Sequence, residues 1–223
     1  MTMFSTATLV STEDARSRLT PALAQHMRGA DLEVMLDREL MLDDATDRSG
    51  VLVLPGGVAI DGDLLLDFET AIHRGQGFRG IVALGALEVR GDILNTNCDG
   101  GPFLVVLGPL TVRHIIKGGA AVAVAGPLAS SGTIYCAYNH GSFRAWGGLK
   151  AEAIIIDDHL FELAGPIDAI RLVLGEEDPF AYLLPELLWE EEGEPMDDLG
   201  DELIVRIKAG VPIFRTDAPR SVP

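Results

Sequence analysis

Four side chains in this sequence could bind a metal ion or exchange protons: Cys98, His140, Asp158 and His159. Imidazole, thiolate and carboxylate groups are the usual zinc ligands, and an imidazole beside a carboxylate can act in acid–base catalysis. The spacing, however, contains neither C-x₂-C nor H-x₃-H. Two interpretations are open, a metal or acid–base site or one structural turn used twice. We favour the structural turn, and therefore expect no cofactor, no metal and no catalytic residue.

The choice depends on whether the chain around the histidines repeats. Six similar segments align on glycines, and alternate positions on both sides of each glycine are apolar, whereas half of the intervening positions three residues away are polar. A period of two predicts β-strands. The aligned glycines are Gly62, Gly85, Gly108, Gly126, Gly147 and Gly165. The residues two positions further on are Leu64, Leu87, Leu110, Leu128, Leu149 and Ile167.

The steps between these glycines are shorter than the roughly 30 residues of a βαβ unit. They fit turns of a β-helix, whose rungs stack about 4.8 Å apart. We predict an all-β fold, a single-stranded parallel β-helix of about six rungs, with residues 154–156 in a third wall. Parallel crossovers favour the right hand, so we expect a right-handed coil. A β-sandwich with even spacing is the alternative.

The sequence divides into an N-terminal helical cap or arm (residues 1–50), the solenoid (51–175) and an acidic helical C-terminal cap (176–223). The first part predicts a helix over residues 20–29 with Pro21 at its first position. The last part predicts one helix that begins after Asp178 and another that ends at Gly210. We expect these helices to pack on the last rung or against one side of the coil.

The formal charge of −17 argues against nucleic acid as a partner, because phosphate binding needs Lys and Arg. We see neither a signal peptide nor an apolar run that could cross a membrane, and two cysteines are too few for a disulfide framework. These features predict a cytoplasmic protein with no membrane partner. The charge is compatible with a basic protein partner.

Twelve acids and no Lys or Arg lie between residues 172 and 205. This acidic block is either a solvated capping face or an electrostatic docking surface for a basic protein. Aromatic residues nearby could anchor such a partner or simply pack the capping helix. The predicted partner-binding residues are Tyr182, Trp189, Glu190, Glu191, Glu192, Asp197 and Asp198.

Three stretches, "LVVLGPLTV", "YNHGSFRAWGGLKA" and "IIIDDH", resemble the repeats of bacterial bactofilin-like, polymer-forming β-helix proteins. The tail segment "DPFAYLLPELL" is also similar to tails in such proteins. The resemblance implies a self-assembling scaffold, although the helical ends and uneven rungs depart from bactofilins and would obstruct end-to-end stacking. The repeats also look like solenoid immunity proteins of bacterial toxin systems, which implies a toxin-binding role.

The sequence therefore predicts a non-enzymatic, protein-binding β-solenoid, in the first place an immunity-type protein that neutralises a basic bacterial toxin domain. One alternative is a bactofilin-like cytoskeletal scaffold that forms homo-oligomers. The other is a β-helix enzyme with its site at the corners that hold His140, Asp158 and His159.

Overall fold

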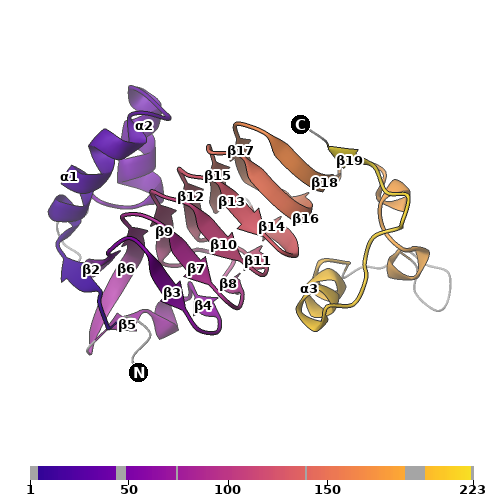
Figure 1. The fold of residues 1–223 in the computed structure, drawn as a ribbon, viewed down its shortest axis with the longest axis horizontal. Coiled ribbons are helices and arrows are strands. Elements are labelled where there is room, and N and C mark those ends of the chain that lie inside the picture. The colour runs from indigo at the N-terminus through magenta and orange to yellow at the C-terminus, as the bar shows by residue number, and fades with distance from the viewer. Residues whose placement is uncertain (1–4, 44–48, 74, 139, 189–198, 222–223) are drawn as a thin grey trace.

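The computed structural model describes residues 5–43, 49–73, 75–138, 140–188 and 199–221. This part of the chain is mostly β-structure, and parallel strands stack into a β-solenoid of about five turns (Figure 1). The predicted class, a parallel β-helix, is confirmed.

One wall of the coil is a sheet in which each turn adds one parallel strand to the previous one. Two pairings are antiparallel: the first strand of the sheet covers the first rung, and β5 (Ile72–His73) forms a hairpin with β6. In spatial order the strands are β1 (Thr8–Val10), β2 (Gly50–Leu54), β6 (Gln76–Ala83), β9 (Phe103–Val106), β12 (Ala121–Val124), β15 (Ser142–Ala145) and β17 (Leu160–Leu163).

The other sheet bends to form two walls. The first of these walls contains β3 (Val58–Ile60), β7 (Leu87–Val89), β10 (Leu110–Val112) and β13 (Leu128–Ser130). The predicted third wall contains β4 (Leu64–Leu65), β8 (Ile93–Asn95), β11 (Ile115–Lys117) and β14 (Thr133–Ala137). Two long strands, β16 (Leu149–Asp157) and β18 (Ile167–Leu174), continue through both walls, and the short β19 (Arg220–Ser221) pairs antiparallel with β18.

The predicted column of aliphatic side chains is present: Leu87, Leu110, Leu128 and Leu149 are successive partners, and Ile167 follows them. These side chains belong to the apolar core inside the coil. Such columns stabilise each rung through its neighbours, because a single rung cannot bury its own apolar face.

The alignment of the first turn was wrong by six residues. Val58, not Leu64, is the partner of Leu87, and the first corner glycine is Gly56, not Gly62. A Cβ on Gly56 would lie 3.2 Å from the Cα of Gly85, so consecutive corners approach too closely for side chains. The first turn is longer than the others because it also holds a 3₁₀ turn (Phe68–Thr70) and the β5–β6 hairpin.

The predicted N-terminal helix lies elsewhere in the sequence. Helix α1 spans Thr12–Leu23, and the Ser11 hydroxyl caps it by accepting a hydrogen bond from the Asp14 amide at 3.1 Å. Pro21 therefore falls in its last turn rather than at its first position. The capping signal at Ser11 decided the start of the helix. A short α2 (Ala30–Val34) and a π-helical turn (Met35–Glu39) follow.

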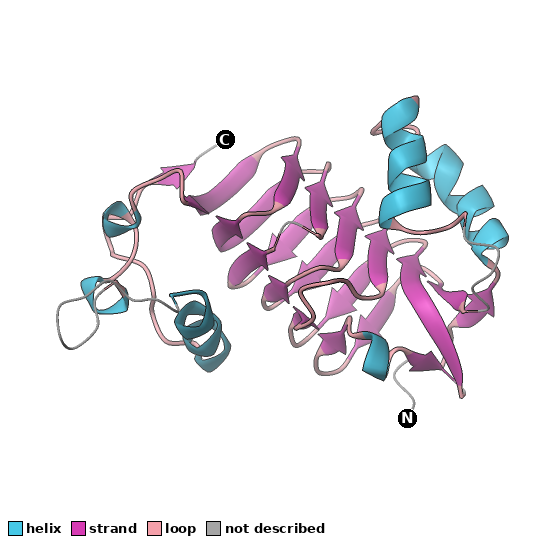
Figure 2. Cartoon of the chain, turned by 180° about the vertical axis from the view of Figure 1, so that it is seen from behind, coloured by secondary structure: helices cyan, strands magenta, loops and turns pink. Residues whose placement is uncertain are grey.

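These helical segments cover the outer face of the first sheet (Figure 2). Leu19, Leu23 and Leu36 pack against outward-facing residues such as Val82 and Val105, and all five side chains are fully buried. The contact continues along the coil to Trp146, which directly follows β15. The N-terminal segment is thus a lateral layer along one flank.

The C-terminal segment covers a different flank, the outer face of the third wall. It contains two 3₁₀ turns (Pro179–Ala181 and Pro185–Leu187) and helix α3 (Leu199–Ala209), which ends before Gly210 as predicted. Asp178 accepts a hydrogen bond from the Phe180 amide at 3.0 Å, but only a 3₁₀ turn follows, because Pro185 stops a longer helix.

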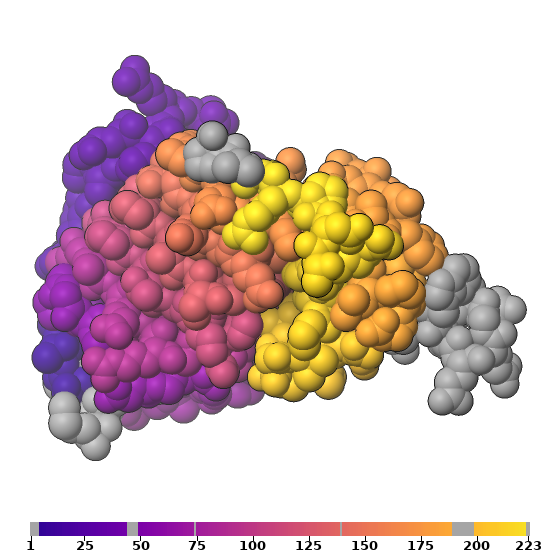
Figure 3. Space-filling view, turned by 45° about the vertical axis from the view of Figure 1, so that its right-hand side comes forward, coloured from indigo at the N-terminus to yellow at the C-terminus, as the bar shows by residue number. Residues whose placement is uncertain are grey.

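Leu183, Leu187, Leu203 and Ile207 of this segment form a third apolar cluster with the coil. Figure 3 shows the segment lying directly on the later turns. Helix α3 packs on a flank of the coil, and the segment after Asp178 contributes 3₁₀ turns in place of the predicted helix. Among the described helices, none is long and apolar enough to cross a membrane.

Candidate functional site

The structure does not bring the two predicted histidines together. His140 is an exposed side chain whose Nδ1 lies 3.5 Å from the Asp99 carboxylate. Asp99 directly follows Cys98 in the sequence. Asp158 is also exposed, and no hydrogen bond or ion pair joins it to either histidine within the described ranges. Cys98 carries a free thiol. The described residues contain no group of three or more His, Cys, Asp and Glu side chains placed to hold a metal.

His159 instead points into the coil and contacts Lys117, which the sequence analysis missed. Its Nε2 lies 2.6 Å from Lys117 Nζ, and its Nδ1 lies 2.5 Å from the Tyr138 carbonyl oxygen. A carbonyl only accepts, so Nδ1 carries the proton and Nε2 accepts from the ammonium. Burial, followed by the Lys117 charge, lowers the pKa of His159 to about 4.

Lys117 belongs to a polar stretch of an inward-facing column. Its neighbours on adjacent turns are Asn95 and Cys136, and Ile156 follows them. Lys117 is only 1% exposed and donates to the Gly118 carbonyl at 2.9 Å. Burial lowers the pKa of this lysine to about 8 and raises the pKa of the Cys136 thiol to about 12. This ammonium is satisfied and enclosed, which makes it a structural element of the core.

Asn95 completes the same column with a saturated network. Its amide nitrogen donates to the Leu66 carbonyl and to the Asp67 carboxylate, both at 2.9 Å, while its oxygen accepts from the Ala120 amide at 2.8 Å. Asp67 also accepts from the amides of Thr96 and Asn97. These bonds join neighbouring turns, whereas within the corner the Asn97 side chain accepts from the Asp99 amide at 2.8 Å, which is the local contact expected of an Asn in a turn.

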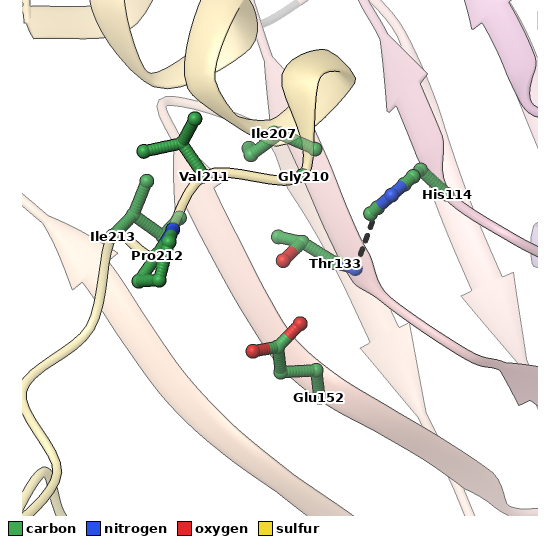
Figure 4. Close-up of a pocket in the computed structure, with 8 residues that line it drawn as sticks. All are labelled: His114, Thr133, Glu152, Ile207, Gly210, Val211, Pro212 and Ile213. Atoms are coloured by element: carbon green, nitrogen blue, oxygen red, sulfur yellow. Dashed lines mark hydrogen bonds between the residues drawn. The ribbon is translucent and has the colours of Figure 1, made fainter.

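A small cavity of about 100 Å³ lies between the coil and the C-terminal segment (Figure 4). His114, Thr133 and Glu152 come from successive turns of the coil and face the segment after α3. His114 Nδ1 accepts from the Thr133 amide at 3.0 Å, and burial lowers the pKa of this histidine. A space of this size suits a few waters more than a metabolite, since ligand pockets usually span about 300–1,000 Å³.

A larger cleft of about 580 Å³ lies on the opposite flank, where the N-terminal helical layer meets the last strands of the first sheet. At its centre, Arg144 of β15 donates from Nη2 to Glu39 at 2.8 Å and from Nε to Glu162 of β17 at 3.1 Å. Ser142 donates to Glu39 at 2.6 Å. Glu39 is the last residue of the π-helical turn, so the site is assembled from segments more than a hundred residues apart.

The charge of Arg144 is stabilised despite its burial. The side chain is 8% exposed, and burial alone would lower its pKa, but the bonds to Glu39 and Glu162 outweigh burial and raise it. Glu162 also accepts from the Trp146 indole at 3.0 Å, and the Trp146 ring stacks on His26 with centroids 4.9 Å apart. Both carboxylates are thus held in place without any ligand.

The cleft lining carries an excess of negative charge. Asp31, Glu39 and Glu162 oppose Arg28 and Arg144, and the exposed side chains of Val34 and Leu160 add an apolar border. Part of this site was visible in the sequence, because Arg144 and Glu162 occupy equivalent positions of consecutive segments and are strand partners. Glu39 carried no such signal.

Most residues of the predicted partner-binding set lie outside the described residues, namely Trp189, Glu190, Glu191, Glu192, Asp197 and Asp198. The remaining one, Tyr182, is partly buried, packs with the C-terminal apolar cluster and donates to Glu177 at 3.2 Å. These contacts fit the packing interpretation of Tyr182.

Fold and site together define a β-solenoid with a lateral cleft whose lining includes three carboxylates and two arginines. No protein-family model matches the chain, and neither the curated proteins nor the solved structures give a match.

Proposed function

We propose that this chain is a non-enzymatic, protein-binding β-solenoid that docks a basic protein, in the manner of an immunity protein that masks a toxin domain. The observation that carries the proposal is the cleft built on Arg144, in which Glu39 and Glu162 are fixed at the edge of a rigid coil. A preformed site of this kind binds a partner without the cost of ordering its own side chains.

The charge distribution supports a basic partner. The lining has more carboxylates than cations, and the whole chain carries −17. An acidic field accelerates encounter with a basic protein and repels acidic ones. The cytoplasmic location belongs to the same proposal, as does the acidic block over residues 172–205, which would guide the partner toward the coil.

The proposal keeps the finer description of the coil as six right-handed rungs with helical caps. Six corner glycines, with Gly56 in place of Gly62 in the first turn, support the rung number, and the helical segments that pack on the outer faces of the coil support the caps. An experimental structure of the whole chain tests both.

The test is to purify the chain with the protein encoded by the adjacent reading frame, which the proposal predicts to be basic, and to measure their affinity by calorimetry at low and high salt. We expect the affinity to fall by roughly tenfold or more as salt screens the charges. Co-expression should also restore growth to cells that produce the neighbouring protein alone.

Charge reversal locates the contact. Asp31→Lys changes an exposed residue of the cleft and should weaken binding by about tenfold. Glu69→Lys makes the same change in the 3₁₀ turn Phe68–Thr70, outside the cleft lining, and should leave the affinity unchanged. Reversal of Glu190, Glu191 and Glu192 tests the acidic block in the same assay. If the affinity is independent of salt and is unchanged by Asp31→Lys, the cleft is not the docking site.

A further inference from the structure

The coil covers some of its terminal strands and leaves others open. At the start of the first sheet β1 pairs with β2, and at the end of the second sheet β19 pairs with β18. In the described residues β3, β4 and β17 end their sheets without a partner on the outer side. Of these three, β17 is the longest, since β3 and β4 have three and two residues. Figure 1 shows β17 as the last strand of its wall.

The backbone hydrogen bonds of Ala164, which directly follows β17, show which N–H and C=O groups of the strand point away from β15. The Ala164 amide donates to the Ala145 carbonyl at 2.9 Å, and the Ala164 carbonyl accepts from the Gly148 amide at 3.1 Å. Ala164 therefore directs both backbone groups toward the preceding turn. Because successive residues of a strand alternate in direction, Glu162 does the same, and Phe161 and Leu163 direct their N–H and C=O groups to the open side.

The side chains around this open edge suit a protein strand. Phe161 stacks on Phe143 with centroids 4.8 Å apart, and Phe161 and Leu163 are only partly buried at the end of the apolar core. Leu160 is 52% exposed on the outer face. An added strand would extend the core and cover these groups, as in recognition by β-strand addition.

Glu162 determines which charge is favourable in the added strand. Its side chain is 46% exposed and lines the cleft on the outer face of β17. A residue directly opposite Glu162 in an added strand would point to the same face, and pairs of opposite charge are favourable there. Asp31, across the cleft, adds a second carboxylate.

We infer that the basic partner binds by adding an extended segment to the free edge of β17, with a lysine or arginine opposite Glu162. This inference rests on the proposed function and states how that partner is held. Backbone bonds to Phe161 and Leu163 would supply affinity, and the acidic cleft would supply selectivity.

A second copy of this chain fits the edge less well. Two molecules that each carry −17 repel one another. If two β17 strands paired antiparallel about Glu162, the two acids would also lie opposite each other, which is destabilising. A basic segment meets neither penalty.

The experiment uses the full chain and a capped peptide of alternating valine and lysine, with amide hydrogen exchange followed by NMR. In the free chain the amides of Phe161 and Leu163 should exchange fast, and those of Glu162 and Ala164 slowly. Saturating peptide should slow exchange at Phe161 and Leu163 by at least about tenfold. A peptide with glutamate in place of lysine should not.

A matched pair of variants isolates the backbone contact. Leu163→Pro removes an N–H that points away from β15, whereas Leu163→Ala removes the same packing but keeps that N–H. We expect the proline variant to bind the lysine peptide roughly five- to tenfold more weakly than the alanine variant. Unchanged far-ultraviolet circular dichroism would establish that both variants are folded.

Three results would overturn the inference: unprotected Phe161 and Leu163 amides at saturating peptide, equal protection by the glutamate peptide, and concentration-dependent protection without peptide. The last result would make a second copy the occupant. If the neighbouring protein binds tightly and both Leu163 variants bind it equally, β-strand addition is wrong while the proposed function stands. If the neighbouring protein does not bind at all but the lysine peptide does, the proposed partner is wrong, whereas the inference that β17 accepts a basic strand remains.

Discussion

His140 lies at the surface beside Asp99, whereas His159, one turn further along the coil, points inward to Lys117. The two corners connect equivalent positions of adjacent turns. Before the corners Ala137 pairs with Asp157, and after them Ser142 pairs with Leu160. Four residues connect the strands at the first corner and two at the second. Similar sequence motifs thus place their histidines in opposite environments because the corner lengths differ.

Gly141 is the residue that makes room for the inward histidine. A Cβ at this position would lie 2.5 Å from the Gly118 carbonyl oxygen and 2.8 Å from both the His159 ring and Lys117 Nζ. The inward His159 therefore depends on three turns of the coil, whereas the contacts of the outward His140 side chain are with Asp99 and Tyr138. Substitutions at the two corners should differ accordingly.

The largest effect is expected for Gly141→Ala. The new methyl group would meet backbone as well as buried side chains, so the free energy of unfolding should fall by about 4 kcal/mol, measured by urea denaturation. Gly77→Ala is the control, because its Cβ would meet only the Ala71 carbonyl at 3.9 Å. Equal losses for the two variants would contradict the crowding described around Gly141.

Lys117→Ala should cost about 3 kcal/mol, since it leaves a cavity and deprives His159 and the Gly118 carbonyl of their donor. Lys150→Ala removes a lysine whose side chain is 76% exposed and should change stability by less than about 0.5 kcal/mol. The same urea titration compares them. If Lys117→Ala changes the stability as little as Lys150→Ala does, the Lys117 ammonium reaches solvent.

Acid should destabilise the fold through His159. Its pKa is about 4 in the folded chain and 6.5 for the ordinary side chain, so between these values the unfolded state binds more protons. Stability is therefore retained above pH 6.5 and lost as the pH falls toward 4, by on the order of 3 kcal/mol. His159→Gln should flatten this part of the pH profile, and an unchanged profile in this variant would contradict the inward position of His159.

The smallest effect is expected for His140→Ala. The His140–Asp99 pair is separated by 3.5 Å and its side chains are 57% and 88% exposed, so the pair contributes little. The change in thermal midpoint should stay within about 2 °C. A larger shift in the thermal midpoint would contradict this account, because it would mean that His140 makes stabilising contacts beyond its pair with Asp99.

The sequence predicted the coil well because its signal is repeated. Alternating apolar residues and corner glycines occur in every turn, so the columns through Leu110 and Leu128 followed from the spacing alone. The first turn failed because one insertion, the segment around β5, shifted a register that the other turns could not correct. The start of α1 was missed because Pro21 was given more weight than the Ser11 cap.

The sites were harder to predict than the coil. Lys117 lies at an inward position whose partners on adjacent turns are Asn95 and Cys136, and nothing local reveals that a buried cation will meet a histidine 42 residues later. Glu39 reaches Arg144 across 105 residues through helix packing. Only the Arg144–Glu162 partnership, which joins equivalent positions of adjacent turns, was accessible from the repeat.

Both corners, the cleft and the free edge depend on consecutive turns that stack in register. Thr111 and Ala129 are exposed partners on adjacent turns, so cysteines at these two positions should form a disulfide readily in a Cys98→Ser background. The offset pair of Thr111→Cys with Ser131→Cys spans roughly 8 Å and should not. Mass spectrometry after mild oxidation should find the intramolecular disulfide in the first variant alone; a disulfide in the offset pair and none in the first would contradict the stacked coil.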